Sequence, residues 1–202
     1  MNTAPELAFD FLDPWGWVAV RRLAIAMAQV GEPLDVLFQP CRSPLSRVAA
    51  GGAYAEFLER RFGTQAAVHQ SLVAAEMQKL GIELAFSAIR SAPDTCPALV
   101  AVLWLQRTGK PAVAFVERVF EALYCHGQDI GDEAVLQRLL SAEGVSFADI
   151  LAFMRSDACA VELEQIEASV AAWAGRVIPS FRINGTVIFG AQTPGVLAPM
   201  LA

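Results

Sequence analysis

Hydrophobic residues alternate with other residues in two short segments near the start of the chain. Residues 6–12 alternate in this way, which predicts a strand, and residues 34–40 predict a second strand. Between them, Asp13 and Pro14 predict the start of a helix, because Asp is a good N-cap and Pro suits the first helical position. Gly31 is expected to end that helix. The opening is therefore a β-α-β unit, in which the two strands normally run parallel.

Residues 45–175 change to helical spacing and contain no convincing strand longer than a few residues. The apolar stripes are Leu72, Val73, Met77 and Leu80 in one segment, and Phe115, Val116, Val119, Phe120 and Leu123 in another. Asp132 can cap a helix, and Ser146 with Asp149 matches a capping box. Gly175 is expected to end the last helix of this block.

Two more strands are expected close to the C-terminus. Asn184 and Gly185 form a strong hairpin signal between the apolar residues of 181–183 and 186–189. Pro194 is expected at the start of a short final helix. The chain thus reads β-α-β, a helical block, then β-β-α. This pattern predicts an α/β fold with a large all-helical insertion.

The composition narrows the class of protein. Of the 202 residues, 55% are hydrophobic, which is ample for a core and makes a homodimer a plausible assembly. The longest apolar stretch, Cys96–Leu105, is far shorter than the roughly 20 residues of a membrane span, so no membrane insertion is expected. A net charge of −6 argues against nucleic-acid binding. Residues 1–6 do not resemble a signal peptide, so we expect a cytoplasmic protein.

The cysteines and histidines offer little redox or metal chemistry. The four cysteines are Cys41, Cys96, Cys125 and Cys159, and no two form a C-x-x-C unit. We expect no disulfide and mostly buried thiols, although Cys41 has the sequence context of an exposed residue. Cys96 follows a helix-start signal that could lower its thiol pKa, but the apolar run after it favours an inert, buried side chain. With only His69 and His126 present, no metal site is expected.

The order of elements, with Val177-Ile178-Pro179-Ser180-Phe181 before the hairpin, resembles a thioredoxin fold of the DsbA type. Short stretches resemble the FrnE-like branch of that family: Leu58-Glu59-Arg60-Arg61-Phe62-Gly63, Asp94-Thr95, Gly109-Lys110, Asp129-Ile130-Gly131-Asp132 and Phe189-Gly190-Ala191-Gln192-Thr193-Pro194. The segment 9–17 also resembles the openings of 2-hydroxychromene-2-carboxylate isomerases and kappa-class glutathione transferases.

This resemblance implies a thioredoxin-like domain made of residues 1–44 and 174–202, with a helical insertion over 45–173. It also implies that the Ile178–Pro179 peptide bond is cis and faces the start of the first helix. In the family, the residue before this proline presents its backbone groups to a peptide or to glutathione. Glutathione is therefore a candidate ligand, and no other cofactor is indicated.

The chain departs from the family at the strand-to-helix junction. FrnE-like oxidoreductases have Cys-Pro-Trp-Cys there, whereas this chain has Asp13-Pro14-Trp15-Gly16. Asp13 cannot form a mixed disulfide and Gly16 cannot resolve one, so dithiol exchange at this site is excluded chemically. The glutathione-dependent relatives have a Ser in the first position. An ionised carboxylate cannot donate the hydrogen bond that a thiolate would accept from that Ser.

Two functions remain open. The sequence favours a redox-silent family member that binds a peptide or small ligand, and the alternative is a glutathione-dependent isomerase or transferase. The candidate catalytic residue is Asp13, and the candidate ligand-binding residues are Pro14, Trp15, Gly16, Ile178 and Pro179. For Asp13 a plain helix-capping role is favoured. Trp15 could line a pocket or the core, whereas core packing is favoured for Trp17. Arg42 and Arg47 could meet an acidic ligand, although solvated surface is favoured for both.

Overall fold

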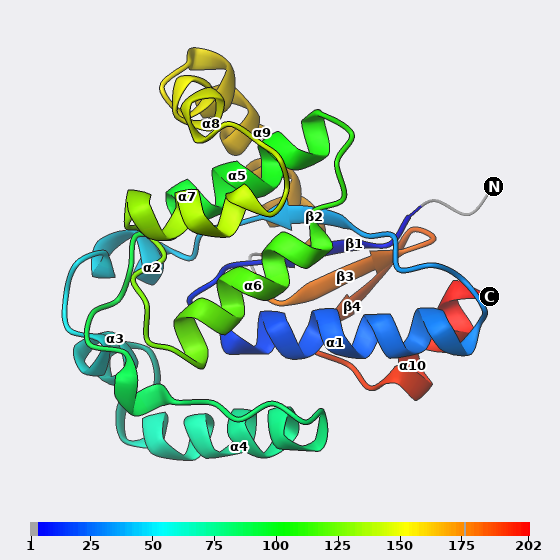
Figure 1. Ribbon diagram of the computed structural model, residues 1–202. Coiled ribbons are helices and arrows are strands. Elements are labelled where there is room, and N and C mark those ends of the chain that lie inside the picture. The colour runs from blue at the N-terminus through cyan, green and yellow to red at the C-terminus, as the bar shows by residue number, and fades with distance from the viewer. Residues whose placement is uncertain (1–3, 176) are drawn as a thin grey trace.

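A computed structural model describes residues 4–175 and 177–202 (Figure 1). Four strands form one sheet in the order β2-β1-β3-β4. The strands are β1 (Glu6–Phe9), β2 (Leu37–Pro40), β3 (Ser180–Ile183) and β4 (Thr186–Phe189). β1 and β2 are parallel, whereas β3 is antiparallel to both β1 and β4. The β-α-β and β-β-α units are therefore joined in one sheet, which is the thioredoxin-like arrangement that the resemblance implied.

The segment between β2 and β3 is helical. The helices of the chain are α1 (Pro14–Gln29), α2 (Pro44–Ala49), α3 (Tyr54–Phe62), α4 (Ala66–Lys79), α5 (Cys96–Arg107), α6 (Val113–Tyr124), α7 (Glu133–Ser141), α8 (Phe147–Met154), α9 (Asp157–Ala174) and α10 (Pro194–Leu201). Two short 3-10 turns, Gly63–Gln65 and Phe86–Ala88, lie within this segment. The expected division into domains at residues 44 and 174 stays a prediction.

The alternation in β1 sends its side chains to two different cores. Leu7 and Phe9 are fully buried in the large core that includes α1, and Ala8 is fully buried on the other face of the sheet. There Ala8 packs with Val170 and Ala174 of α9. Each large apolar side chain buried in this way contributes roughly 1.5–3 kcal/mol, which is why the alternation fixes the orientation of the strand.

Several predicted start and stop signals are confirmed. Asp13 is the N-cap of α1, and Asp132 accepts hydrogen bonds from two amides at the start of α7. Gly175 ends α9 with a φ of 57°. At the hairpin, Asn184 has a φ of 48° and Gly185 a φ of 80°, as a two-residue turn of this type requires.

Other expectations were wrong in detail. The strand expected over 6–12 ends at Phe9, because the chain turns there and the amide of Asp13 donates to the carbonyl of Asp10 at 3.0 Å. The capping box at Ser146 does not form, since that side chain makes no capping bond. Leu72 was expected beside Val73 on the inner face of its helix, but its side chain is 56% exposed.

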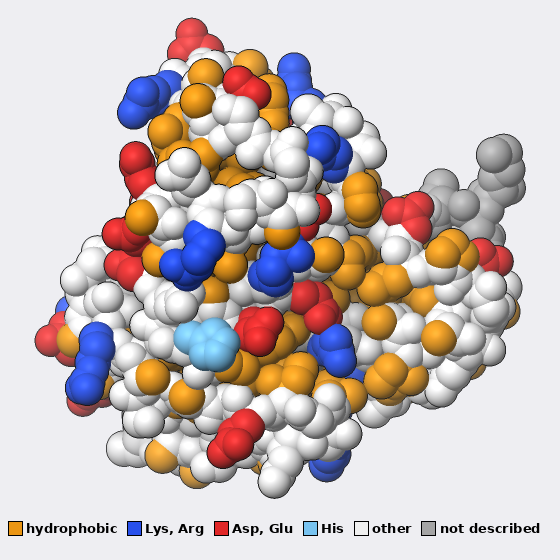
Figure 2. All heavy atoms as spheres, in the orientation of Figure 1, with side chains coloured by type: hydrophobic (Ala, Val, Ile, Leu, Met, Phe, Trp, Pro, Cys, Tyr) orange, Lys and Arg blue, Asp and Glu red, His pale blue; other side chains and the backbone are white. Residues whose placement is uncertain are grey.

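Among the described helices, none is long and apolar enough to cross a membrane. On the face seen in Figure 2, acidic and basic side chains are interspersed rather than gathered by sign.

Candidate functional site

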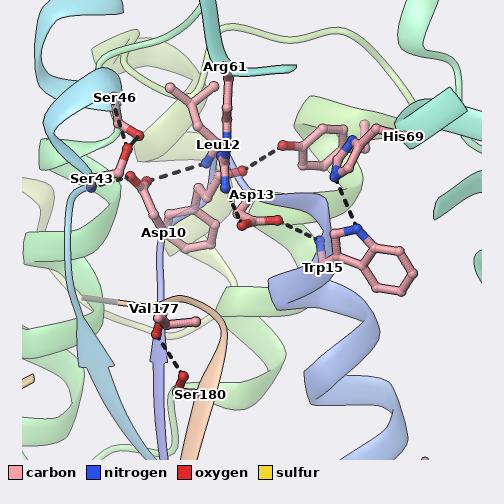
Figure 3. A network of polar contacts seen from close by, with 12 residues as sticks. Asp10, Leu12, Asp13, Trp15, Ser43, Ser46, Arg61, His69, Val177 and Ser180 are labelled. Atoms are coloured by element: carbon pink, nitrogen blue, oxygen red, sulfur yellow. Dashed lines mark hydrogen bonds and ion pairs between the residues drawn. The ribbon is translucent and has the colours of Figure 1, made fainter. Parts of the chain in front are cut away.

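Asp13 lies at the start of α1 and uses both of its carboxylate oxygens. Oδ1 accepts a hydrogen bond from the amide of Trp15 at 3.0 Å, which is the capping bond of the helix. Oδ2 accepts from Nη2 of Arg61 at 2.6 Å. The residue is only 3% exposed, and the Arg61 side chain is 18% exposed. Asp13 is therefore the anion of a buried ion pair that joins α1 to α3 (Figure 3).

The ion pair restricts what Asp13 can do chemically. Both of its carboxylate oxygens already accept a hydrogen bond, one from an amide and one from a guanidinium. A general base in that state would have to give up its arginine before it could take a proton from a ligand. The geometry thus favours the capping role that the sequence suggested, with Arg61 as a partner that the sequence did not reveal.

Next to this pair, Trp15 is held by a histidine from α4. The indole Nε1–H of Trp15 donates to Nε2 of His69 at 3.0 Å, so His69 must be neutral at that nitrogen. The His69 ring also stacks on Phe62 with centroids 3.8 Å apart. Burial lowers the pKa of His69, and Arg61 acts in the same direction, whereas Asp13 opposes them. These contacts fix the half-buried Trp15 against α3 and α4 (Figure 3).

A second carboxylate, that of Asp10, lies at the end of β1 and is fully buried. It accepts hydrogen bonds from the amides of Leu12 and Ser43, each at 3.3 Å. Burial raises the pKa of Asp10, and these amides together with the Ser46 hydroxyl only partly offset that rise. Asp10 therefore ties the loop after β2 to the start of α1. The sequence analysis missed this role, although an Asp within an apolar strand pattern was an available signal.

Gly16 packs closely against the aromatic core. A Cβ added there would lie 3.0 Å from Cζ of Phe120 and 3.5 Å from Cβ of Phe9, so the first of these neighbours would have to shift. Trp17, which follows it, is 3% exposed and stacks on Phe120 with an interplanar angle of 5°. The prediction that Trp17 packs in the core is confirmed. The aromatic core thus lies directly against Gly16, the position of the family's second cysteine.

The predicted cis peptide bond between Ile178 and Pro179 is confirmed. The antiparallel register pairs Ala8 with Ser180, which places Pro179 and Ile178 beside the end of β1 and so near the start of α1. The carbonyl of Pro179 accepts from the amide of Gly190 at 2.8 Å. Within 4–175 and 177–202, no hydrogen bond engages the amide or the carbonyl of Ile178.

The six candidate residues differ in their access to solvent. Pro14, Gly16 and Pro179 are buried, as is Asp13, whereas Trp15 and Ile178 are half-buried. The structure therefore brings the candidates to one end of the sheet but leaves only two with side chains that a ligand could contact.

The cysteines contribute little to this site. Cys41 is buried at 4% exposure, so the expectation of an exposed thiol was wrong; the turn after β2 packs it in the small core beneath α9. Burial raises the pKa of the Cys96 thiol and outweighs any lowering by its place at the start of α5. All four cysteines lie in the described ranges and form no disulfide. In those ranges no three His, Cys, Asp or Glu side chains gather so that they could hold a metal ion.

The fold and the cis-proline loop define a thioredoxin-like protein. More specifically, residues 6–202 match the family of DSBA-like thioredoxin domains, and the chain belongs to that family. No curated protein sequence matches the chain. Its assignment to the FrnE-like branch stays a prediction.

Solved structures resemble this fold along nearly its whole length. A probable DsbA oxidoreductase from Streptomyces coelicolor is 18% identical with a TM-score of 0.79, covering 98% of this chain and 88% of its own. A 2-hydroxychromene-2-carboxylate isomerase is 17% identical with a TM-score of 0.75, covering 98% and 93%. The cytosolic disulfide reductase DsbM from Pseudomonas aeruginosa, solved with glutathione, is 19% identical with a TM-score of 0.66, covering 98% and 94%. At these identities the likeness shows the fold alone.

Proposed function

We propose that this chain is a redox-silent member of the DSBA-like thioredoxin family that binds a peptide or small ligand at the cis-proline loop. The observation that carries the proposal is the Asp13–Arg61 ion pair, which occupies the position of the family's reactive cysteine. A helix N-terminus that would stabilise a thiolate here stabilises a carboxylate instead.

Gly16 supports the redox-silent part of the proposal, because it supplies no resolving thiol. A cysteine in its place would require only that the Phe120 ring move slightly. Cysteines elsewhere in the chain do not replace the missing Cys-x-x-Cys pair. Burial raises the thiol pKa of Cys96 and of Cys125, which lowers the fraction of reactive thiolate.

The main chain of Ile178 supports the binding part. A peptide-like ligand can add to exposed backbone N–H and C=O groups as an extra strand does. Ile178 offers both groups without a hydrogen-bond partner in the described residues, and the half-buried indole of Trp15 belongs to the same end of the sheet.

Redox silence is tested with dithiothreitol-coupled reduction of insulin. We expect no turnover above that of dithiothreitol alone. The variant Asp13→Cys with Gly16→Cys restores the Cys-Pro-Trp-Cys motif and serves as the matched control for the assay. Wild-type turnover that survives Cys41→Ala with Cys96→Ala would contradict the proposal.

Binding is tested by NMR titration with reduced glutathione and with S-methylglutathione, followed at the Ile178 amide. If the main chain makes the contacts, both ligands should shift this resonance similarly, because the thiol takes no part. Ile178→Ala keeps the main chain and should bind within a few-fold of wild type. Ile178→Pro removes the N–H donor, so its titration is followed at the Trp15 indole N–H instead, and it should bind at least about tenfold more weakly. An unshifted Ile178 amide with both ligands would refute main-chain recognition of this class.

A second candidate is a glutathione-dependent isomerase or transferase, in line with the similarity to the 2-hydroxychromene-2-carboxylate isomerase. Asp13 weakens it, because both of its carboxylate oxygens act as hydrogen-bond acceptors and offer no donor to a thiolate. Thermal-shift measurements with glutathione and aromatic acids distinguish the two candidate functions. If the protein is an isomerase or transferase, glutathione and an aromatic acid together should raise the melting temperature more than either alone; a redox-silent binding protein need not show this.

Location and assembly are also proposals. We infer a cytoplasmic protein, in keeping with the cytosolic description of DsbM. A homodimer would cover some of the large apolar side chains that are about half exposed, such as Phe189 and Val196. Light scattering after size-exclusion chromatography tests this assembly directly.

A further inference from the structure

A second polar region lies on the other side of the sheet, between α9 and the turn that follows β2. Two neighbouring pockets of about 340 and 470 Å³ share four charged lining residues there. These are Arg42, Arg47, Glu164 and Glu167. We call the two pockets together the α9 cavity. Their volumes fall in the range of small-molecule sites.

Arg42 is the unusual member of the α9 cavity. Its side chain is only 23% exposed, yet it makes no hydrogen bond to any residue of 4–175 or 177–202. Its Nε forms a loose ion pair with Oε1 of Glu167 at 3.8 Å, too far for a hydrogen bond, and neither atom has a hydrogen-bond partner among the described residues. A buried N–H without a hydrogen bond is unfavourable, and the guanidinium keeps donors with which a ligand from outside the chain could pair.

Glu167 cannot fully neutralise Arg42, because it also forms an ion pair with Arg47. The other oxygen of Glu167 accepts a hydrogen bond from Arg47 of α2. One carboxylate thus lies between two guanidinium groups, and the second carboxylate of the α9 cavity comes from Glu164. Glu164, an exposed residue one helical turn before Glu167, provides a negative charge at the rim.

The rest of the larger pocket is mostly apolar. Met154 of α8 lines it, together with Leu163 and other side chains of α9. An apolar group placed there would be removed from water while charged groups bind at the other end.

We propose that the α9 cavity binds a zwitterionic α-amino acid with an apolar side chain. The ligand carboxylate would pair with the guanidinium of Arg42, which suits a bidentate contact. Its ammonium would face Glu164, and its side chain would lie against Met154 and Leu163. Because the α9 cavity contains none of the residues of the cis-proline site, this inference stands apart from the proposed function.

The test uses the full-length protein with ¹³C-methyl-labelled methionine and unlabelled L-leucine as the probe. Binding should shift the Met154 methyl resonance saturably and leave that of Met77, which is fully buried, in place. L-Leucinamide lacks the carboxylate and should bind at least about tenfold more weakly. N-Acetyl-L-leucine lacks the ammonium and should lose about threefold or more, since Glu164 is exposed.

Variants locate the site. Arg42→Gln should weaken L-leucine binding at least about tenfold, while its melting temperature stays close to that of wild type. Arg107→Gln is the matched control, because it breaks an ion pair to Glu162 that also joins α5 to α9 but lies outside the α9 cavity. It should bind L-leucine as wild type does.

Two results would overturn the proposal. One is an unshifted Met154 methyl with L-leucine up to about 10 mM, which would exclude even weak millimolar affinity. The other is binding to which Arg42→Gln makes no difference or that L-leucinamide reproduces, since either would mean that the ligand carboxylate does not meet Arg42.

Discussion

Two arginine–carboxylate clusters in this protein have opposite character. At the start of α1, Arg61 and Asp13 form a pair in which both carboxylate oxygens are bonded and solvent is almost excluded. In the α9 cavity, Arg42 is also largely buried, but it makes no hydrogen bond within 4–175 and 177–202 and shares Glu167 with Arg47. The first cluster holds elements together, whereas the second leaves donor groups unused.

The difference shows where a ligand could gain binding energy. A ligand at Asp13 would have to replace bonds that the protein already makes, and removing one partner of a buried pair is costly. A ligand at Arg42 would instead supply bonds that are missing. In the proposed function, the position that is reactive in the wider family is structural here, and ligands bind in neighbouring parts of the fold.

The largest expected effect is that of Arg61→Ala. The change leaves the Asp13 carboxylate buried without its cation, which should lower the free energy of unfolding by about 3–5 kcal/mol. Urea unfolding measures it. Arg60→Ala is the matched control, because Arg60 is 58% exposed and, among the described residues, pairs only with the exposed Glu56; it should cost less than about 0.5 kcal/mol. Equal losses in the two variants would show that the buried pair has no special weight.

Asp13→Asn should have the next largest effect. From the capping role alone, Asn would be nearly neutral, because it caps about as well as Asp. With Arg61 as partner, the variant also loses a charged hydrogen bond, so we expect a loss of about 2 kcal/mol in urea unfolding. Asp13→Ala should lose roughly 1 kcal/mol more, because the cap is removed as well. An Asn variant as stable as wild type would mean that Arg61 does not depend on Asp13.

The Trp15–His69 contact should have a smaller effect that depends on pH. Trp15→Phe removes the indole donor and should cost about 1 kcal/mol at neutral pH.

The pKa of His69 is lowered from its ordinary value of 6.5, so the unfolded chain takes up the proton first as the pH falls. Stability from this group is therefore present above that value and is lost on acidification through it.

His69→Gln isolates this effect, because Gln can accept the Trp15 bond but does not titrate. Unfolding measured between about pH 7.5 and 5 should show a smaller loss of stability for the variant than for wild type. Parallel curves for the two proteins would indicate that the titration of His69 is not linked to folding.

The smallest effect is expected for Arg42→Gln. Since Arg42 gives up no hydrogen bond to the described residues, the free energy of unfolding should stay within about 0.5 kcal/mol of wild type. Circular-dichroism melting provides the measurement. A loss of stability as large as that of Arg61→Ala would contradict the contrast between the two clusters. It would show that the contacts of Glu167 with Arg42 and Arg47 stabilise the fold.

Local signals in the sequence predicted much of the fold. Asp13 and Pro14 predicted the start of α1, and Asn184-Gly185 predicted the hairpin between β3 and β4; both depend on a few neighbouring residues. Leu72 shows the limit of such signals, because an apolar side chain beside a helical stripe can still face solvent. Which face of a helix is covered depends on elements that lie far away in the chain.

The sequence by itself determined the order of strands and helices and, through the missing C-x-x-C, excluded dithiol chemistry at the start of α1. These conclusions depend on neighbouring residues and on residue chemistry. Only the tertiary structure decided that Arg61, 48 residues from Asp13, neutralises it, and that Arg42 lies in a cavity without a hydrogen-bond partner among the described residues. Such pairings depend on where α3 and α9 lie in the folded chain. A long side chain can reach many partners, and the packing of these helices selects one of them.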